Sequence, residues 1–124
     1  MPEAHVIATH QLTKRFGQFA AVEALDLNVR AHQITGFLGR NGAGKSTTIE
    51  MLEGLLKPTS GSIHYRGAPL GSRYRERVGI QFQSTSLQDH LTVHENLKFF
   101  SALYPQRRPL GELITLCRLE EFLD

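Results

Sequence analysis

A glycine-rich run at residues 39–47 has the residue types and the spacing of a phosphate-binding loop, because it matches the pattern GxxxxGK[ST] at every fixed position. Glycines accept positive φ and let consecutive backbone N–H groups approach phosphate oxygens. We therefore predict that this run binds a nucleoside triphosphate. Its residues are Gly39, Arg40, Asn41, Gly42, Ala43, Gly44, Lys45, Ser46 and Thr47.

The last three residues of the run bring side-chain chemistry. Lys45 is expected in the first turn of a helix, where its ammonium can bridge the terminal phosphates beside the positive end of the helix dipole. Ser46 offers a hydroxyl to Mg²⁺, which takes small oxygen ligands and retains several waters. Thr47 is expected to contact the phosphate nearest the sugar.

The elements on either side of the run are those that the motif requires. The short apolar segment 34–38 ends at a glycine and predicts a buried strand that leads into the loop. A helix is expected to follow, and residues 57–61 are helix breakers that end it. Its apolar face is predicted to consist of Ile49, Leu52, Leu55 and Leu56.

Strand patterns lie before and after this helix. Residues 6–16 are rich in β-formers, and the alternation of Leu25, Leu27 and Val29 with polar residues predicts a second strand. Further strands are predicted at 62–66, which the segment 67–69 interrupts, and at 78–82.

Helical patterns dominate the last third of the chain. Thr92 and Glu95 stand at capping-box spacing, so a helix is predicted to start at Thr92 and to end at Pro105. Its apolar stripe is predicted to be Val93, Leu97, Phe100 and Tyr104. Another short helix fits residues 110–122.

Composition limits the function classes. The 124 residues, 40% hydrophobic and 21% charged, indicate one globular domain at most. A net charge of +2 is too small to favour nucleic acid, and the single Cys117 favours a reducing cytosol. No apolar run fits a signal peptide or a membrane span, so any membrane role is expected to go through a partner.

From about Leu12 onward the chain resembles the ATP-binding subunit of an ABC transporter. Its phosphate loop is similar to the family's GPNGAGKST, with Arg40 in place of proline. Residues 55–63 are similar to the family's turn after the first helix. The segment LTVHENL at 91–97 looks like the family's LTVxENL, which is typical of export-type members.

The resemblance adds ligands and two site residues. It implies ATP with Mg²⁺ as the bound nucleotide. It places Phe16 against the adenine ring, where tyrosine is commoner, and stacking needs only the π face that phenylalanine retains. It assigns Gln83 to the Mg²⁺ ion, together with Ser46, and to coupling with a membrane subunit.

The fold implied is α/β: a P-loop NTPase, specifically an ABC-type ATPase core fragment with an antiparallel β subdomain. Residues 1–82 are expected to form the β subdomain and phosphate loop, and residues 83–124 the start of the helical subdomain. In the family, the strand neighbours of the segment 34–38 lie further along the chain. We therefore expect exposed apolar surface here, with poor solubility or dependence on a partner chain.

The function implied is to power a transporter, specifically an exporter. The expected partners are a membrane-spanning subunit and a second ATP-binding subunit in a dimer, with no nucleic acid. The location would be cytoplasmic, peripheral on the inner face of the membrane. After Asp124 the family continues to an LSGGQ signature, a strand ending in Asp-Glu and a switch histidine. None of these is in the sequence, so no catalytic residue is assigned, and ATP binding without turnover is expected.

Two alternatives stay open: a DNA- or ribosome-associated ABC-type ATPase and a P-loop small-molecule kinase. A zinc-protease HExxH is excluded, because Lys98 stands where the second histidine is needed. His90 and His94 are interpreted as a solvated pair. Arg73, Arg75 and Arg77 are interpreted as a solvated edge.

Overall fold

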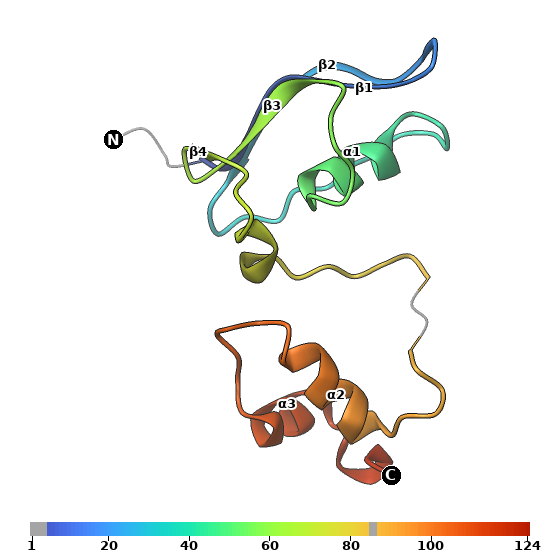
Figure 1. Ribbon diagram of the computed structural model, residues 1–124, viewed down its shortest axis with the longest axis vertical. Helices are drawn as coiled ribbons and strands as arrows, with labels where there is room; N and C mark the ends of the chain where they lie inside the picture. Colours follow the sequence, from blue (N-terminus) through green and yellow to red (C-terminus); the bar gives the residue numbers. More distant parts are fainter. Residues whose placement is uncertain (1–4, 85–86) are drawn as a thin grey trace. The chain divides into compact units, whose positions relative to one another are not determined.

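The computed structural model describes residues 5–84 and 87–124. The chain forms two compact units, Met1–Val78 and Gly79–Asp124. The strands and the first α-helix lie in the first unit, and the later α-helices lie in the second (Figure 1). The subdomain boundary expected at residues 82–83 stays a prediction.

Unit 1 contains an antiparallel sheet with strand order β2-β1-β3-β4, which confirms an antiparallel β subdomain. The third strand breaks before residues 67–69, as predicted, and Ala68 then pairs back with Tyr65. The strands are β1 (His5–Phe16), β2 (Phe19–Arg30), β3 (Ser60–Tyr65) and β4 (Ala68–Pro69).

Side chains join β1 and β2 where their ladder is irregular. The buried Thr9 hydroxyl donates to the Leu25 carbonyl at 2.8 Å and accepts from the Leu27 N–H at 2.9 Å. Beside it, the Gln11 N–H and side-chain amide both donate to the Asp26 carboxylate, at 2.7 and 2.8 Å. These bonds satisfy backbone groups that a bulge would otherwise leave unpaired.

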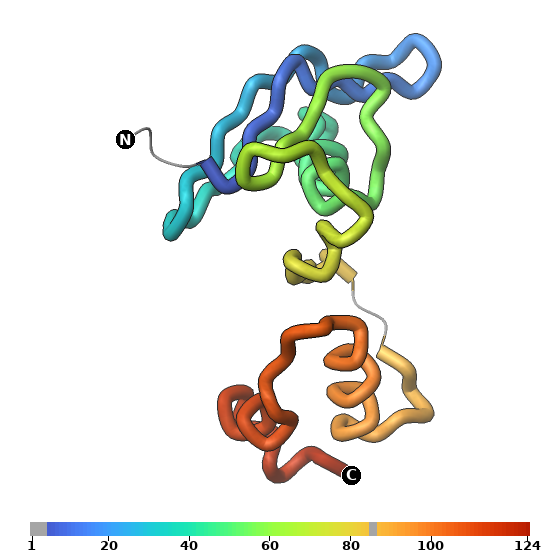
Figure 2. The backbone as a smooth tube through the Cα atoms, turned by 60° about the vertical axis from the view of Figure 1, so that its left-hand side comes forward, coloured from blue at the N-terminus to red at the C-terminus, as the bar shows by residue number. Residues whose placement is uncertain are grey.

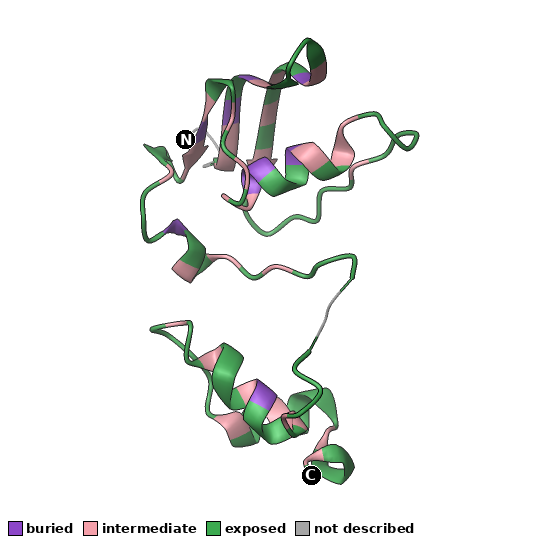
Figure 3. Cartoon of the chain, turned by 45° about the vertical axis from the view of Figure 1, so that its right-hand side comes forward, coloured by how far each residue is buried: buried purple, intermediate pink, exposed green. Residues whose placement is uncertain are grey.

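The core of unit 1 lies between the sheet and helix α1 (Lys45–Leu52), which runs along one face of the sheet (Figure 1). Met51 is fully buried and Leu52 nearly so, because they pack against apolar residues of three strands. Figure 3 shows the buried positions on these facing surfaces. The strand residues are Leu12, Val22 and Ile63.

Helix α1 is shorter than predicted. It ends at Leu52, so Leu55 and Leu56 do not belong to its apolar face. The Gly54 N–H bonds to the Met51 carbonyl at 3.1 Å and turns the chain out of the helix. Leu56 still packs against the core, whereas Leu55 is 44% exposed.

Two predicted strands are not formed. In the described part of the chain, residues 34–38 and 78–82 carry no strand ladder. The prediction that 34–38 is buried is wrong, since Ile34 and Leu38 are almost fully exposed and only Phe37 packs against the core. A strand of this kind is stabilised by its neighbours, and none of the described strands lies beside it. The exposure agrees with the expected apolar surface.

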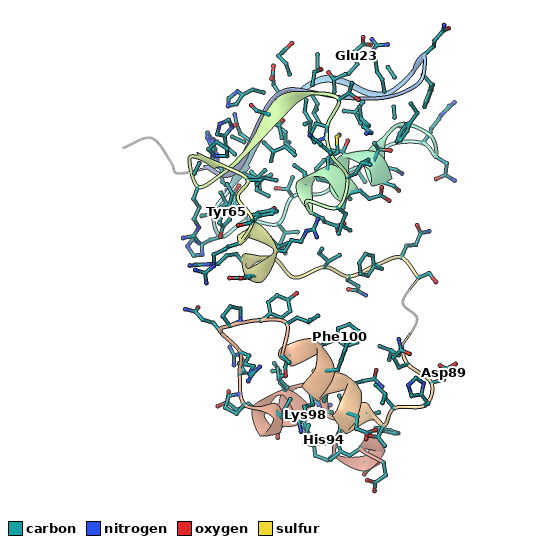
Figure 4. The ribbon with its side chains drawn as sticks, in the orientation of Figure 1. Glu23, Tyr65, Asp89, His94, Lys98 and Phe100 are labelled. Carbon is teal, nitrogen blue, oxygen red and sulfur yellow. The ribbon has the colours of Figure 1, made fainter. Side chains whose placement is uncertain are left out.

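A short 3₁₀-helix, η1 (Tyr74–Arg77), was not predicted. The buried Tyr74 O–H donates to the Leu52 carbonyl at 2.6 Å, and its ring meets the Tyr65 ring edge-on at 5.3 Å. Figure 4 shows Tyr65 beside η1. Burial raises the pKa of Tyr74. This tyrosine therefore connects the end of α1 with the end of β3.

Unit 2 contains α2 (Val93–Ser101), α3 (Leu110–Cys117) and the 3₁₀-helix η2 (Glu120–Phe122). The single helix predicted over 110–122 is wrong, because Arg118 has a φ of 55° and ends α3. The chain then returns to the start of α2, where the His94 N–H meets the Leu123 carbonyl at 3.4 Å (Figure 2).

The N-terminal cap of α2 is confirmed, although the helix ends at Ser101 and not next to Pro105. The Glu95 N–H donates to the Thr92 hydroxyl at 3.1 Å, and the Thr92 N–H donates to the Glu95 carboxylate at 2.9 Å.

Among the residues that the structure describes, no helix is long and apolar enough to span a membrane.

Replacing Thr92 with Ala should destabilise α2 by about 1 kcal/mol, a typical loss for an N-cap. The hydrogen bond from the Thr92 N–H, followed by that from its side chain, lowers the pKa of Glu95. Because the pKa of Glu95 is lower in the folded protein, its ionised carboxylate stabilises the fold at pH values above the pKa of the unfolded chain. This stabilisation is lost as pH falls through the pKa of the folded protein. NMR titration of Glu95 should therefore show a higher pKa in Thr92→Ala than in the parent, with Ser101→Ala as the control. Because the Thr92 backbone N–H remains in this variant, the expected rise is partial, and an unchanged pKa together with an unchanged free energy of unfolding would contradict the side-chain cap.

Candidate phosphate-binding site

The predicted phosphate loop leads directly into α1. Inside the loop the Ala43 N–H donates to the Arg40 carbonyl at 3.1 Å. Gly44 is the N-cap of α1, with a φ of 93° in the left-handed region that favours glycine. The helix thus begins at Lys45, directly after the turn, and this order of loop and helix is the one that the motif requires.

A close approach between Gly44 and β2 fixes this turn. A Cβ atom on Gly44 would overlap the Ala21 carbonyl oxygen and would stand 3.2 Å from a Val22 methyl. The first turn of α1 therefore rests directly on the backbone of β2, and only glycine fits at this position.

The Lys45 ammonium lies at the loop and not in open solvent. It donates a hydrogen bond to the Gly39 carbonyl, so its side chain reaches back over the loop. A Cβ on Gly39 would stand 3.3 Å from that of Ala43 and 3.7 Å from the Lys45 chain. The cation and the loop backbone thus converge on one small region.

The N-terminal end of α1 is suited to an anion. Gly44 gives no side-chain cap, so the N–H groups of the first turn lack the partner that a cap would supply, and no acidic residue lies in this turn. The carboxylates Glu50 and Glu53 lie toward the other end of the helix, where burial, followed by repulsion from Glu50, raises the pKa of Glu53.

Three hydroxyl residues follow Lys45. Ser46 is exposed, Thr47 is half-buried and Thr48 is buried. Thr48 was not predicted from the sequence. Its hydroxyl donates to the Gly44 carbonyl at 2.8 Å, and its N–H donates to the same oxygen at 2.9 Å. Thr48 thus anchors the turn, and Ser46 is the hydroxyl left accessible to a metal ion.

Phe16 ends β1 and pairs with Phe19 across the hairpin. Its ring is half exposed, and the Lys14 ammonium lies 5.2 Å from its centre. Ala21, on which Gly44 rests, is two residues along β2 from Phe19, a distance of about 7 Å in a strand. The hairpin therefore brings Phe16 to the same end of unit 1 as the phosphate loop.

Gln83 belongs to the other unit. It lies in an exposed, irregular segment after Gly79, not at the end of a strand. Its role at a metal ion stays a prediction.

Comparisons with known proteins agree on one family. The family model described as "ABC transporter" matches residues 22–124. A solved structure described as the ATP-binding subunit of an ABC transporter matches with a TM-score of 0.82 and 28% identity, over 95% of this chain and 52% of that one.

Two curated relatives are 45% identical to the chain. The "Probable multidrug ABC transporter ATP-binding protein YbhF" of Escherichia coli (strain K12) matches over 109 residues, 86% of this chain and 19% of that protein. The "Bacitracin transport ATP-binding protein BcrA" of Bacillus licheniformis matches over 95 residues, 74% of this chain and 31% of that protein. The chain thus spans less than a third of either relative.

Replacing Gly44 with Ala should lower the free energy of unfolding more than replacing Gly42 with Ala. Both glycines have positive φ, but a Cβ on Gly42 meets nothing within 4 Å, so the pair isolates the contact with Ala21. The difference should be about 1–3 kcal/mol, the typical cost of overpacking, in urea unfolding of the two variants. Equal losses would mean that α1 does not rest on β2.

Proposed function

The chain belongs to the ABC transporter family, and we propose that it binds Mg·ATP through residues 39–47, as part of the ATP-binding subunit that powers a transporter. The observation that carries this proposal is the position of Lys45. Its ammonium lies over the loop at Gly39, beside a helix N-terminus without a side-chain cap. Backbone donors and one cation there face the same space, which suits a polyanion.

Each part of the loop has a distinct task. The Lys45 ammonium exchanges the Gly39 carbonyl for the terminal phosphate oxygens, while the first-turn N–H groups of α1 bind the oxygens nearer the sugar. Thr47, in that turn, contacts the phosphate nearest the sugar. Thr48 and Gly44 hold the backbone still during this exchange, because both are fixed by packing and hydrogen bonds.

Phe16 provides the platform for adenine. Its half-exposed ring stands at the end of the hairpin, on the side where the loop meets β2. A base stacks on any aromatic face without needing a hydrogen bond. This placement supports the role that the family resemblance suggests.

The Ser46 hydroxyl would hold Mg²⁺, which takes oxygen ligands, and the family resemblance makes Gln83 a predicted second ligand. Ser46 is exposed at the start of α1, and it directly follows the lysine that holds the phosphates. The metal neutralises phosphate charge when bound. Gln83, from the second unit, would report the nucleotide to a membrane partner.

The transport role rests on the relatives. One is named for multidrug transport and the other for bacitracin transport, and residues 91–97 resemble the export-type segment. We assign the chain to an exporter, bound to a membrane-spanning subunit on the cytoplasmic side and paired with a second ATP-binding subunit. The names of these relatives favour this role over DNA- or ribosome-associated ATPases and kinases.

This chain alone should bind ATP without turnover. Its 124 residues contain no LSGGQ signature and no apolar run followed by Asp-Glu. Phosphoryl transfer depends on positioning and charge neutralisation around the attacking water, which the loop alone does not provide.

Replacing Lys45 with Ala should weaken Mg·ATP binding about a hundredfold, because a charge-assisted contact to the phosphates is lost. Titration calorimetry measures this, and Lys98→Ala, on α2 (Figure 4), is the control that should bind like the parent. Equal affinity in Lys45→Ala would refute the site.

Phosphate release by the parent above that of Lys45→Ala would refute binding without turnover.

Replacing Phe16 with Ala should weaken ATP binding by about 1–3 kcal/mol, the usual loss of one stacked base, whereas Phe16→Tyr should retain it. Phe19→Ala is the matched control, because Phe19 is the exposed cross-strand partner of Phe16. The expected pattern is a larger loss for ATP than for inorganic triphosphate, which has no base. If Phe19→Ala gives the larger loss, adenine lies elsewhere.

A further inference from the structure

A cavity of about 590 Å³ in unit 1 is lined by four histidines, one arginine and four small or apolar residues. Its volume falls in the range of small-molecule sites. Val6, Ala8 and His64 line it as half-buried residues, while the other polar members are exposed. The basic side chains in its lining are His5, His10, His32, His64 and Arg66.

Strand register gathers these side chains on the face of the sheet away from α1. Ile63 is buried in the core, so the next residue, His64, points to the opposite face. Ala8 is the cross-strand partner of His64, and His10 lies two residues further along β1. The His10 and His64 rings meet edge-on with their centres 5.3 Å apart.

The other basic groups enter from the ends of the strands. His5 begins β1 opposite Arg30, the last residue of β2, and His32 follows in the turn. Arg66 follows β3, with its guanidinium 5.6 Å from the centre of the Tyr65 ring. The short β4 brings no charged side chain.

One group in this lining lacks a partner. The Nδ1 atom of His64 is buried and has no hydrogen-bond partner in the described structure. A buried ring nitrogen without a partner costs free energy that a ligand in the cavity would recover.

The chemistry of the lining favours an anion over a metal ion. In the part of the chain that the structure describes, no carboxylate lines the cavity, and no group of three His, Cys, Asp or Glu is placed to hold a metal. Arginine is always cationic, and an ordinary imidazole takes up a proton near pH 6.5. The lining thus holds several N–H donors and no competing acceptor charge.

We propose that this cavity binds a small tetrahedral oxyanion of the phosphate class, at a site separate from the phosphate loop. The half-buried His64 ring and the exposed His10 ring donate to the anion, and Arg66 adds a permanent positive charge at the rim.

The test is an NMR titration of the Lys45→Ala chain, ¹³C-labelled at histidine, with inorganic phosphate and with sulfate. The Lys45→Ala change removes the loop as a competing anion site. The expected result is saturable shifts of His10 and His64 with both anions.

Arg66→Gln should weaken binding roughly tenfold, the loss of one charged contact. Arg66 is exposed, so this variant keeps the fold, and the amide spectrum of unit 1 checks that it does. His64→Gln should also weaken binding, whereas His94→Gln, on α2 (Figure 4), is the control that should not. Affinities in Arg66→Gln and His64→Gln that equal the affinity of the parent would overturn the proposal.

Two further measurements test whether the ligand is a free anion, a metal ion or a lipid. Zn²⁺ that binds at His10 and His64 where phosphate does not would overturn the proposal in favour of a metal site. Sedimentation with phosphatidylcholine vesicles containing phosphatidic acid should not occur. If it occurs and Arg66→Gln abolishes it, the phosphate belongs to a lipid and the free-anion assignment fails.

Discussion

The close contact between Gly44 and the Ala21 carbonyl holds the first turn of α1 against β2, and the geometry of the phosphate loop depends on it. Thr48 strengthens this hold with two hydrogen bonds to the Gly44 carbonyl. At the other end of the helix, Met51 and Leu52 are buried under the sheet. Both ends of α1 are thus fixed to the same sheet, which gives the loop a rigid support on its C-terminal side.

One hairpin therefore serves two purposes. β2 supports the start of α1 at Ala21, and the turn that joins β1 to β2 carries Phe16. Side chains such as Thr9 and Asp26 stabilise the irregular part of this ladder, so the register between β1 and β2 is fixed. Phe16 and the phosphate loop, which are distant in sequence, come to the same end of unit 1 because the same two strands position both.

Two local signals in the sequence were reliable, and two predicted strands that depend on distant partners were not formed. The phosphate loop and the Thr92 cap are set by residues a few positions apart, and the structure forms the loop turn and the cap as expected. The strand at 34–38 was wrong, because pleated pairing needs a neighbour that alternation alone cannot supply. Tyr74 and Thr48 were missed, because each stabilises the fold through a hydrogen bond to a backbone carbonyl, and no sequence pattern indicates such a bond. The roles of Phe16 and Gln83 rest on family resemblance.

The most direct test of the account is an amide NMR titration of the chain with Mg²⁺ and adenylyl imidodiphosphate, an ATP analogue that is not hydrolysed. If backbone donors and the lysine ammonium hold the triphosphate, the largest shifts will fall at Gly42, Gly44 and Lys45, with the Lys45 ammonium released from the Gly39 carbonyl. Shifts that leave these amides unchanged and gather on other residues would contradict the account.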